Sequence, residues 1–116
     1  MKAIIFSWIM LVAVVASSQT ILTVTKTTDP DPFEYPYDFE DSLCDPDMYG
    51  TFQWAIRKAN DIPDSSIIQF NISGTAPHVI QINYSLPDIT KRVRIDGTTQ
   101  SGYGDENPAI IIDGNN

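Results

Sequence analysis

Hydrophobic and polar positions recur on two different periods along this chain. Between residues 50 and 62, apolar positions lie three and four apart, which places them on one face of a helix. Thr51 is suited to cap that helix, because a threonine hydroxyl can accept a backbone N–H bond at a helix start. A helix this short is marginally stable alone, so we expect its apolar face to pack on other elements. The residues predicted to form this structural cap are Thr51, Phe52, Ala55, Ile56 and Ala59.

The other apolar residues form short β-branched runs or alternate with polar residues, as in strands. A first strand is predicted within residues 19–28. Four further runs follow the predicted helix, and residues typical of turns separate them. These runs cover residues 67–70, 79–82, 93–95 and 110–112. Because no second helical pattern lies between them, an alternating β-α-β arrangement is not expected.

The last two runs end alike, in Asp96-Gly97 and Asp113-Gly114. Glycine accepts the positive φ of a corner, and an aspartate side chain can bond within its own turn. Short strands closed by a repeated turn are typical of a solenoid, in which each strand stacks on an earlier one. We therefore expect a mainly β protein whose residues 63–116 form the first turns of a β solenoid. A small antiparallel β-sandwich or a hairpin meander is the alternative.

The predicted strands are few for a solenoid. Four or five short strands make about two turns, whereas about three or more are usually needed for stability. We therefore expect that the natural protein continues past Asn116 and that this chain is its N-terminal fragment.

Residues 1–18 have the pattern of a targeting segment. After Lys2 the chain is almost wholly apolar to Ala16, and two small polar residues follow. The apolar run is shorter than the ~20 residues that a membrane-spanning helix needs. A secretory signal peptide is predicted, with cleavage before Gln19, so the mature chain is expected to be secreted or at the cell surface without a transmembrane segment. A retained N-terminal anchor is the alternative.

Residues 29–49 form an acidic, proline-rich insert without Lys or Arg, in a chain whose net charge is -8. This charge disfavours binding to nucleic acid. Clustered carboxylates suit Ca²⁺, but their spacing here fits neither an EF-hand nor a glycine-rich calcium repeat. We therefore favour a solvated acidic loop over a calcium site, and no other cofactor is predicted. The candidate calcium ligands are Asp29, Asp31, Asp45 and Asp47.

Aromatic residues occupy every second position in the middle of this insert, so an extended chain there has one aromatic face. Such a face can stack on sugar rings and contact a glycan. It can also pack over the predicted helix, and we favour packing because large aromatic side chains tend to be buried. The four aromatic residues are Phe33, Tyr35, Tyr37 and Phe39.

Several motifs occur in an order that resembles one known family. They are Gly50-Thr51-Phe52-Gln53-Trp54-Ala55-Ile56, Ile67-Ile68-Gln69-Phe70-Asn71-Ile72, Pro77-His78-Val79-Ile80, Leu86-Pro87-Asp88-Ile89 and Ile95-Asp96-Gly97-Thr98-Thr99-Gln100-Ser101-Gly102-Tyr103. This order resembles the N-terminal cap region of bacterial secreted right-handed parallel β-helix proteins, which are often adhesin-like surface proteins. The resemblance covers most of residues 20–116. It departs from the family at Phe52-Gln53-Trp54, where a Leu-Arg pattern is usual, and in the length of the acidic insert.

The resemblance implies a right-handed parallel β-helix with the helix of residues 50–62 at its N-terminal end. The implied function is that of a non-enzymatic cap and first turns of an exported surface protein, in adhesion or glycan contact. The implied partners are downstream β-helix turns of the same chain and polysaccharides or host cell-surface glycans. One alternative is the front of a polysaccharide-degrading enzyme whose active site lies beyond residue 116, and another is a free-standing small acidic secreted domain.

No catalytic residue is assigned from the sequence. Asp88, Asp96 and Asp113 are candidates for paired carboxylates, but each lies beside Pro or Gly and is better explained as a turn residue. The basic cluster in residues 91–94 is interpreted as a solvated strand face.

Overall fold

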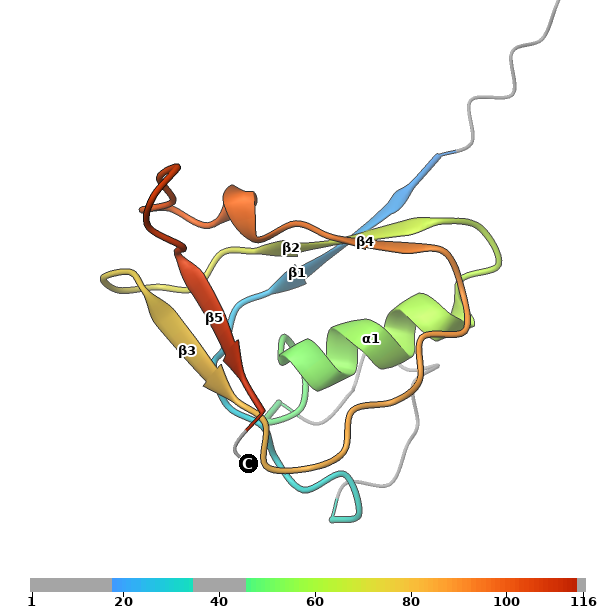
Figure 1. Ribbon diagram of the computed structural model, residues 1–116. Coiled ribbons are helices and arrows are strands. Elements are labelled where there is room, and N and C mark those ends of the chain that lie inside the picture. Colours follow the sequence, from blue (N-terminus) through green and yellow to red (C-terminus); the bar gives the residue numbers. More distant parts are fainter. Residues whose placement is uncertain (1–17, 35–45, 115–116) are drawn as a thin grey trace, which may run out of the picture.

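The computed structural model describes residues 18–34 and 46–114, and in these residues it contains five short strands, one α-helix and one 3-10 turn (Figure 1). The strands are β1 (Thr20–Val24), β2 (Ser66–Phe70), β3 (His78–Gln81), β4 (Val93–Ile95) and β5 (Ile110–Asp113). The helices are α1 (Phe52–Asp61) and the 3-10 turn η1 (Gly97–Thr99). The predicted signal peptide lies outside the described residues, as do Tyr35, Tyr37, Phe39 and Asp45.

Helix α1 lies where the apolar spacing predicts it. The Thr51 side chain is the N-cap, and its Oγ1 accepts a bond from the Trp54 backbone N at 3.1 Å. At the other end the backbone N–H of Ile62 bonds to the carbonyl of Ala59, and Pro63 prevents a further turn. The face that carries Phe52, Ala55, Ile56 and Ala59 is buried. The prediction of a capped helix with a packed apolar stripe is therefore confirmed.

The strands form two separate sheets. The first has the order β1-β2-β4 and the second the order β3-β5. All pairings between these strands are parallel, with Thr20 opposite Ser66, Ser66 opposite Val93, and His78 opposite Ile110. In β2 the alternating residues Ser66, Ile68 and Phe70 point inward and are buried, as expected for a strand with one face on the core.

The predicted fold class is wrong. The described residues form no solenoid: the structure is a small mixed α/β arrangement of a three-stranded sheet, a two-stranded sheet and α1. The antiparallel β-sandwich is also wrong, because the strand pairings are parallel. The repeated Asp-Gly motif misled the prediction, since its two copies differ in structure. Asp96 caps η1, whereas Asp113 is the last residue of strand β5 and Gly114 follows it.

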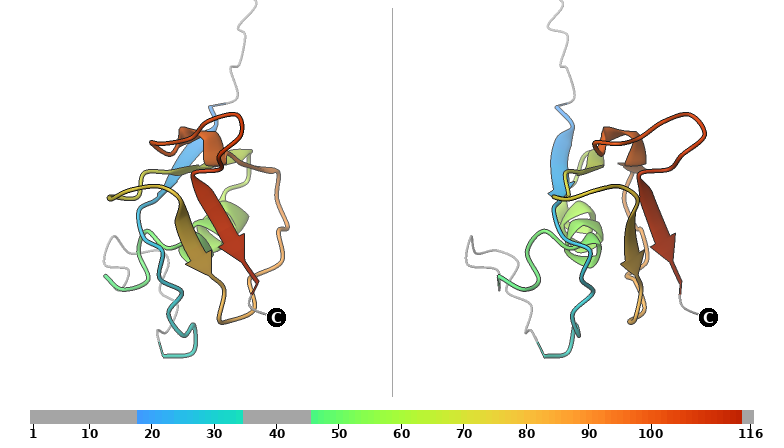
Figure 2. Two further views of the ribbon diagram at one scale, coloured as in Figure 1. Left: turned by 60° about the vertical axis from the view of Figure 1, so that its left-hand side comes forward. Right: turned by 90° about the vertical axis from the view of Figure 1, so that its left-hand side faces the viewer.

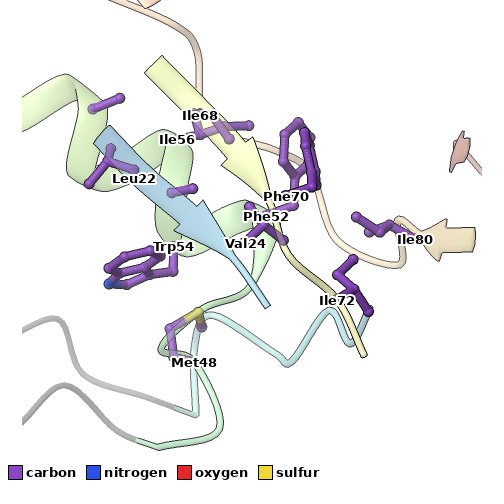
Figure 3. Packing of buried hydrophobic residues seen from close by; sticks show 12 residues of the cluster. Leu22, Val24, Met48, Phe52, Trp54, Ile56, Ile68, Phe70, Ile72 and Ile80 are labelled. Atoms are coloured by element: carbon purple, nitrogen blue, oxygen red, sulfur yellow. The ribbon is translucent and has the colours of Figure 1, made fainter. Parts of the chain in front are cut away.

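One hydrophobic core joins α1 to the first sheet (Figure 3). The helix packs against β1 and β2, so it contributes to the centre of the structure. The rings of Phe52 on α1 and Phe70 on β2 lie 6.1 Å apart between centroids. Ile80 on β3 extends the same buried cluster to the second sheet. The packing of α1 on the first sheet positions the chain segment that leaves β1. That segment borders the candidate functional site.

Gly50 holds this segment close to the start of α1. Its carbonyl accepts backbone bonds from Thr25 at 2.8 Å and Lys26 at 3.2 Å, and its φ is +83°. A Cβ at Gly50 would lie 2.4 Å from the Thr25 Oγ1. We expect Gly50→Ala to lower the free energy of unfolding by about 1–3 kcal/mol, measured by urea denaturation, because alanine disfavours this backbone conformation.

The matched control is Gly104→Ala. A Cβ built at Gly104 meets no atom within 4 Å, and the backbone there needs no left-handed conformation. We expect this variant to change the stability by less than about 1 kcal/mol. Equal effects at the two glycines would contradict the role assigned to Gly50.

Candidate functional site

A cleft of about 740 Å³ lies between the segment that leaves β1 and strand β3. Residues 26–30 form one wall, and Val79, Gln81 and Asn83 form the other. In the right-hand view of Figure 2 the backbone of the segment after β1 and that of strand β3 both run downward. Asp47 also lines the cleft. The site therefore combines residues from three distant parts of the sequence.

The alternation of β3 explains the wall that it supplies. His78 and Ile80 point inward and are buried, which turns Val79 and Gln81 outward. Asn83 follows two positions later and is also exposed. This wall consequently offers one aliphatic side chain and two side-chain amides, each of which can donate and accept hydrogen bonds.

Asp29 lines the cleft and joins its two walls through hydrogen bonds. Its Oδ2 accepts backbone bonds from Asn83 at 2.7 Å and Tyr84 at 3.0 Å. Its Oδ1 accepts a bond from the Gln53 Nε2 on α1 at 3.1 Å. The residue is buried, so this carboxylate joins α1, the first wall and the loop after β3.

Lys26 links the first wall to the end of the acidic insert. Its Nζ donates a hydrogen bond to the carbonyl oxygen of Pro46. The next two residues, Thr27 and Thr28, contribute hydroxyl groups to the lining of the cleft. The cleft lining thus combines hydroxyl, amide, carboxylate and ammonium groups with an apolar surface that is the larger share of its area.

The three candidate calcium ligands that the structure describes, Asp29, Asp31 and Asp47, do not form a metal-binding cluster. Asp29 is used in the three bonds described above, and the Asp31 Oδ1 accepts a bond from the Phe33 backbone N at 2.9 Å. Asp47 lines the cleft, and Asp45 lies outside the described residues. Within residues 18–34 and 46–114, no three His, Cys, Asp or Glu side chains are grouped so that they could hold a metal ion.

Phe33 does not pack over α1. Its side chain is 90% exposed, on a turn that the Asp31 carboxylate stabilises. The packing that we favoured from the sequence is therefore wrong for Phe33, while the other three aromatic positions lie outside the described part of the chain. Phe33 follows the last residue of the first cleft wall, Pro30, by three positions.

The three carboxylates considered for catalysis have separate structural surroundings. Asp96 accepts bonds from the Thr98 hydroxyl at 2.6 Å and backbone N at 3.1 Å, and these bonds lower the pKa of Asp96. The backbone carbonyl of Asp88 accepts a bond from the Asn60 side chain at 2.8 Å. Asp113 pairs with Gln81 in the ladder between β3 and β5. The structure thus places each of the three in a different local setting.

Sequence reasoning missed the cleft and the bonding role of Asp29. Asp29 and Asn83 are 54 positions apart, and no local pattern reports a bond across that separation. One pattern in the sequence could have identified Gln81 and Asn83, because alternate polar residues along a strand share an exposed face.

Comparison of the chain with protein-family models, curated proteins and solved structures gave no match. The resemblance described above consequently stays a prediction. Among the residues that the structure describes, none belongs to a helix with the length and apolar character needed to cross a membrane.

Proposed function

We propose that this chain is a non-catalytic contact module of an exported protein, and that the cleft beside β3 binds glycans. The apolar pattern of residues 1–18 supports export. The observation that carries glycan binding is the exposed Phe33 ring, held on a turn three residues beyond the first wall of a cleft that combines polar side chains with apolar surface.

The chemistry of the cleft supports a ligand rich in hydroxyl groups. Binding sites usually combine an apolar surface with a few polar groups that fix the ligand's orientation. Here Thr27 and Thr28 offer hydroxyls, and Gln81 and Asn83 offer amides, which can all bond to sugar hydroxyls in either direction. Within the cleft, Val79 provides an apolar patch for the C–H face of a pyranose. The exposed Phe33 ring lies outside the cleft lining, three residues beyond Pro30, and offers a further apolar face to a ligand that extends past the first wall.

The test uses the full chain produced through a secretory pathway, together with cellulose, chitin, xylan and mannan as insoluble probes. We expect at least one of these polysaccharides to retain the protein. Phe33→Ala should weaken retention about tenfold or less, since an exposed aromatic contact contributes about 0.5–1.5 kcal/mol. Gln81→Ala should weaken it as well, and the unfolding midpoint should stay unchanged in both variants because both side chains are exposed.

Tyr103→Ala provides the matched control. Tyr103 is also an exposed aromatic residue, but it lies on a loop that does not line the cleft. We expect this variant to bind as the wild type does. Failure of all four polysaccharides to retain the protein, or an equal loss of retention in Tyr103→Ala, would overturn the proposal.

A further inference from the structure

Strand β3 uses the backbone groups of alternate residues to pair with β5. The backbone N–H of His78 donates to the carbonyl of Ala109 at 2.8 Å, so His78 bonds toward β5, which lies beside β3 (Figure 1). Alternate residues of a strand direct their N–H and C=O groups to the same side. The backbone groups of Val79 and Gln81 therefore point to the opposite edge of β3.

This opposite edge of β3 faces the cleft. Asn83 belongs to the same alternate set, and its backbone N–H donates to the Oδ2 of Asp29, in the first wall, at 2.7 Å. In the part of the chain that the structure describes, β3 pairs with β5 alone, and no hydrogen bond reaches the backbone N–H of Val79 or Gln81. We call the backbone N–H and C=O groups of these two residues the open edge of β3.

The open edge of β3 is bounded at both ends. Pro77 precedes it in the alternate set and has no N–H to offer. After it, the Asp29 carboxylate already occupies the N–H of Asn83. A peptide that adds a strand needs a longer run of backbone groups than Val79 and Gln81 supply, and it would have to displace Asp29. A glycan needs only a few bonds, because each sugar hydroxyl can both donate and accept.

The geometry and the charge of the cleft restrict the glycan further. The backbone N–H groups of Val79 and Gln81 lie two strand residues apart, about 6.6 Å along a straight edge. A ligand that bonds to both must run extended along β3, as β-1,4-linked polysaccharides do, whereas α-1,4-linked glucans curve into helices. Lys26 and Asp47 place charges of both signs in the lining, and the net charge of -8 repels acidic sugars. The cleft therefore suits a neutral glycan.

We propose that the open edge of β3 binds an extended, neutral, β-1,4-linked glycan through backbone hydrogen bonds. This inference rests on the glycan binding proposed above and names the ligand class and the groups that hold it. Sugar hydroxyls accept from the N–H groups of Val79 and Gln81 and donate to their carbonyls, while a C–H face of the sugar lies on the Val79 side chain. The ladder with β5 already holds these backbone groups in place, so binding does not have to order them.

Titration of the full chain with soluble hexasaccharides tests this proposal. The probes are cellohexaose, chitohexaose, xylohexaose and mannohexaose, with maltohexaose as the α-1,4-linked control. We expect at least one β-1,4-linked probe to bind at least about tenfold tighter than maltohexaose. At a probe concentration of about ten times Kd, amide exchange with water, measured by NMR, should slow about tenfold at Val79 and Gln81. Ile21 on the outer edge of β1 is the control amide, and its exchange should not change.

A pair of variants at Val79 separates the backbone from the side chain. Val79→Ala keeps the N–H, whereas Val79→Pro removes it, and proline is tolerated where a strand N–H faces an open edge. We expect Val79→Pro to bind about three- to tenfold more weakly than Val79→Ala, the effect of losing one hydrogen bond.

Several outcomes would overturn this inference and leave glycan binding itself in place. They are equal binding of the two Val79 variants, equal affinity for maltohexaose, and binding without slower exchange at Val79 and Gln81. The exchange measurement uses the wild-type chain, so it decides the question even where a variant does not fold. Failure of every polysaccharide to retain the protein would overturn the proposed function together with this inference.

Discussion

Replacing Phe52 with alanine is expected to lower the free energy of unfolding by about 3–5 kcal/mol. Phe52 is 3% exposed and lies on the face of α1 that packs against the first sheet. Its ring meets that of Phe70, so alanine removes a large apolar surface and leaves a cavity at the junction of helix and sheet. Urea denaturation followed by the fluorescence of the buried Trp54 measures the change.

Phe33→Ala is the matched control for Phe52→Ala. It makes the same chemical change at a position that is 90% exposed, so we expect a change in stability within about 0.5 kcal/mol. A loss of less than about 1 kcal/mol in Phe52→Ala would show that α1 does not depend on this face for its position.

Replacing Asp29 with alanine is expected to lower the free energy of unfolding by at least about 3 kcal/mol, since three hydrogen bonds to a charged group are lost and each contributes about 1.5–3 kcal/mol. The variant loses all three bonds of the carboxylate and leaves the backbone donors of Asn83 and Tyr84 without their acceptor. We expect Asp29→Ala to lower both the global stability of the protein and the local stability of the loop after β3. Amide hydrogen exchange should therefore become faster at Asn83 and Tyr84 than in the wild type.

Asp29→Asn and Asp64→Ala separate charge from position. Asn keeps the size of the side chain but offers one acceptor oxygen, so its effect should lie between those of wild type and Asp29→Ala. Asp64 is an exposed acid on the loop before β2, and its removal should change the stability by less than about 0.5 kcal/mol. Similar effects at Asp29 and Asp64 would contradict the bonding role of Asp29.

The sequence predicts local elements of this protein well, because local chemistry determines them. The stripe of Phe52 and Ile56 follows from helix geometry, and Thr51 follows from the preference for a hydroxyl at an N-cap. The β-branched runs likewise coincide with strands. In each of these cases the information lies within about ten residues of the chain.

The arrangement of the elements depends on contacts that the local patterns do not contain. The two Asp-Gly copies look equivalent in sequence, yet the bonds of Asp96 to Thr98 form a 3-10 turn while Asp113 continues a strand. Aromatic residues tend to be buried, but only where another surface covers them. The turn that the Asp31 carboxylate stabilises leaves the Phe33 side chain exposed. The prediction of a solenoid failed for the same reason, because it treated similar turns as repeated structure.

The parallel order of the sheets has a consequence for how the chain folds. Parallel neighbours cannot be joined by a tight hairpin, and the closest paired positions, Ser66 and Val93, are 27 residues apart. Thr20 must find Ser66 across 46 residues that include the whole acidic insert. Such a topology has a high contact order, and its folding rate is limited by the search for distant partners. Lengthening the insert should cost little stability, about 0.6 kcal/mol for each doubling of the closed loop, so this chain can vary there while its native pairing stays the same.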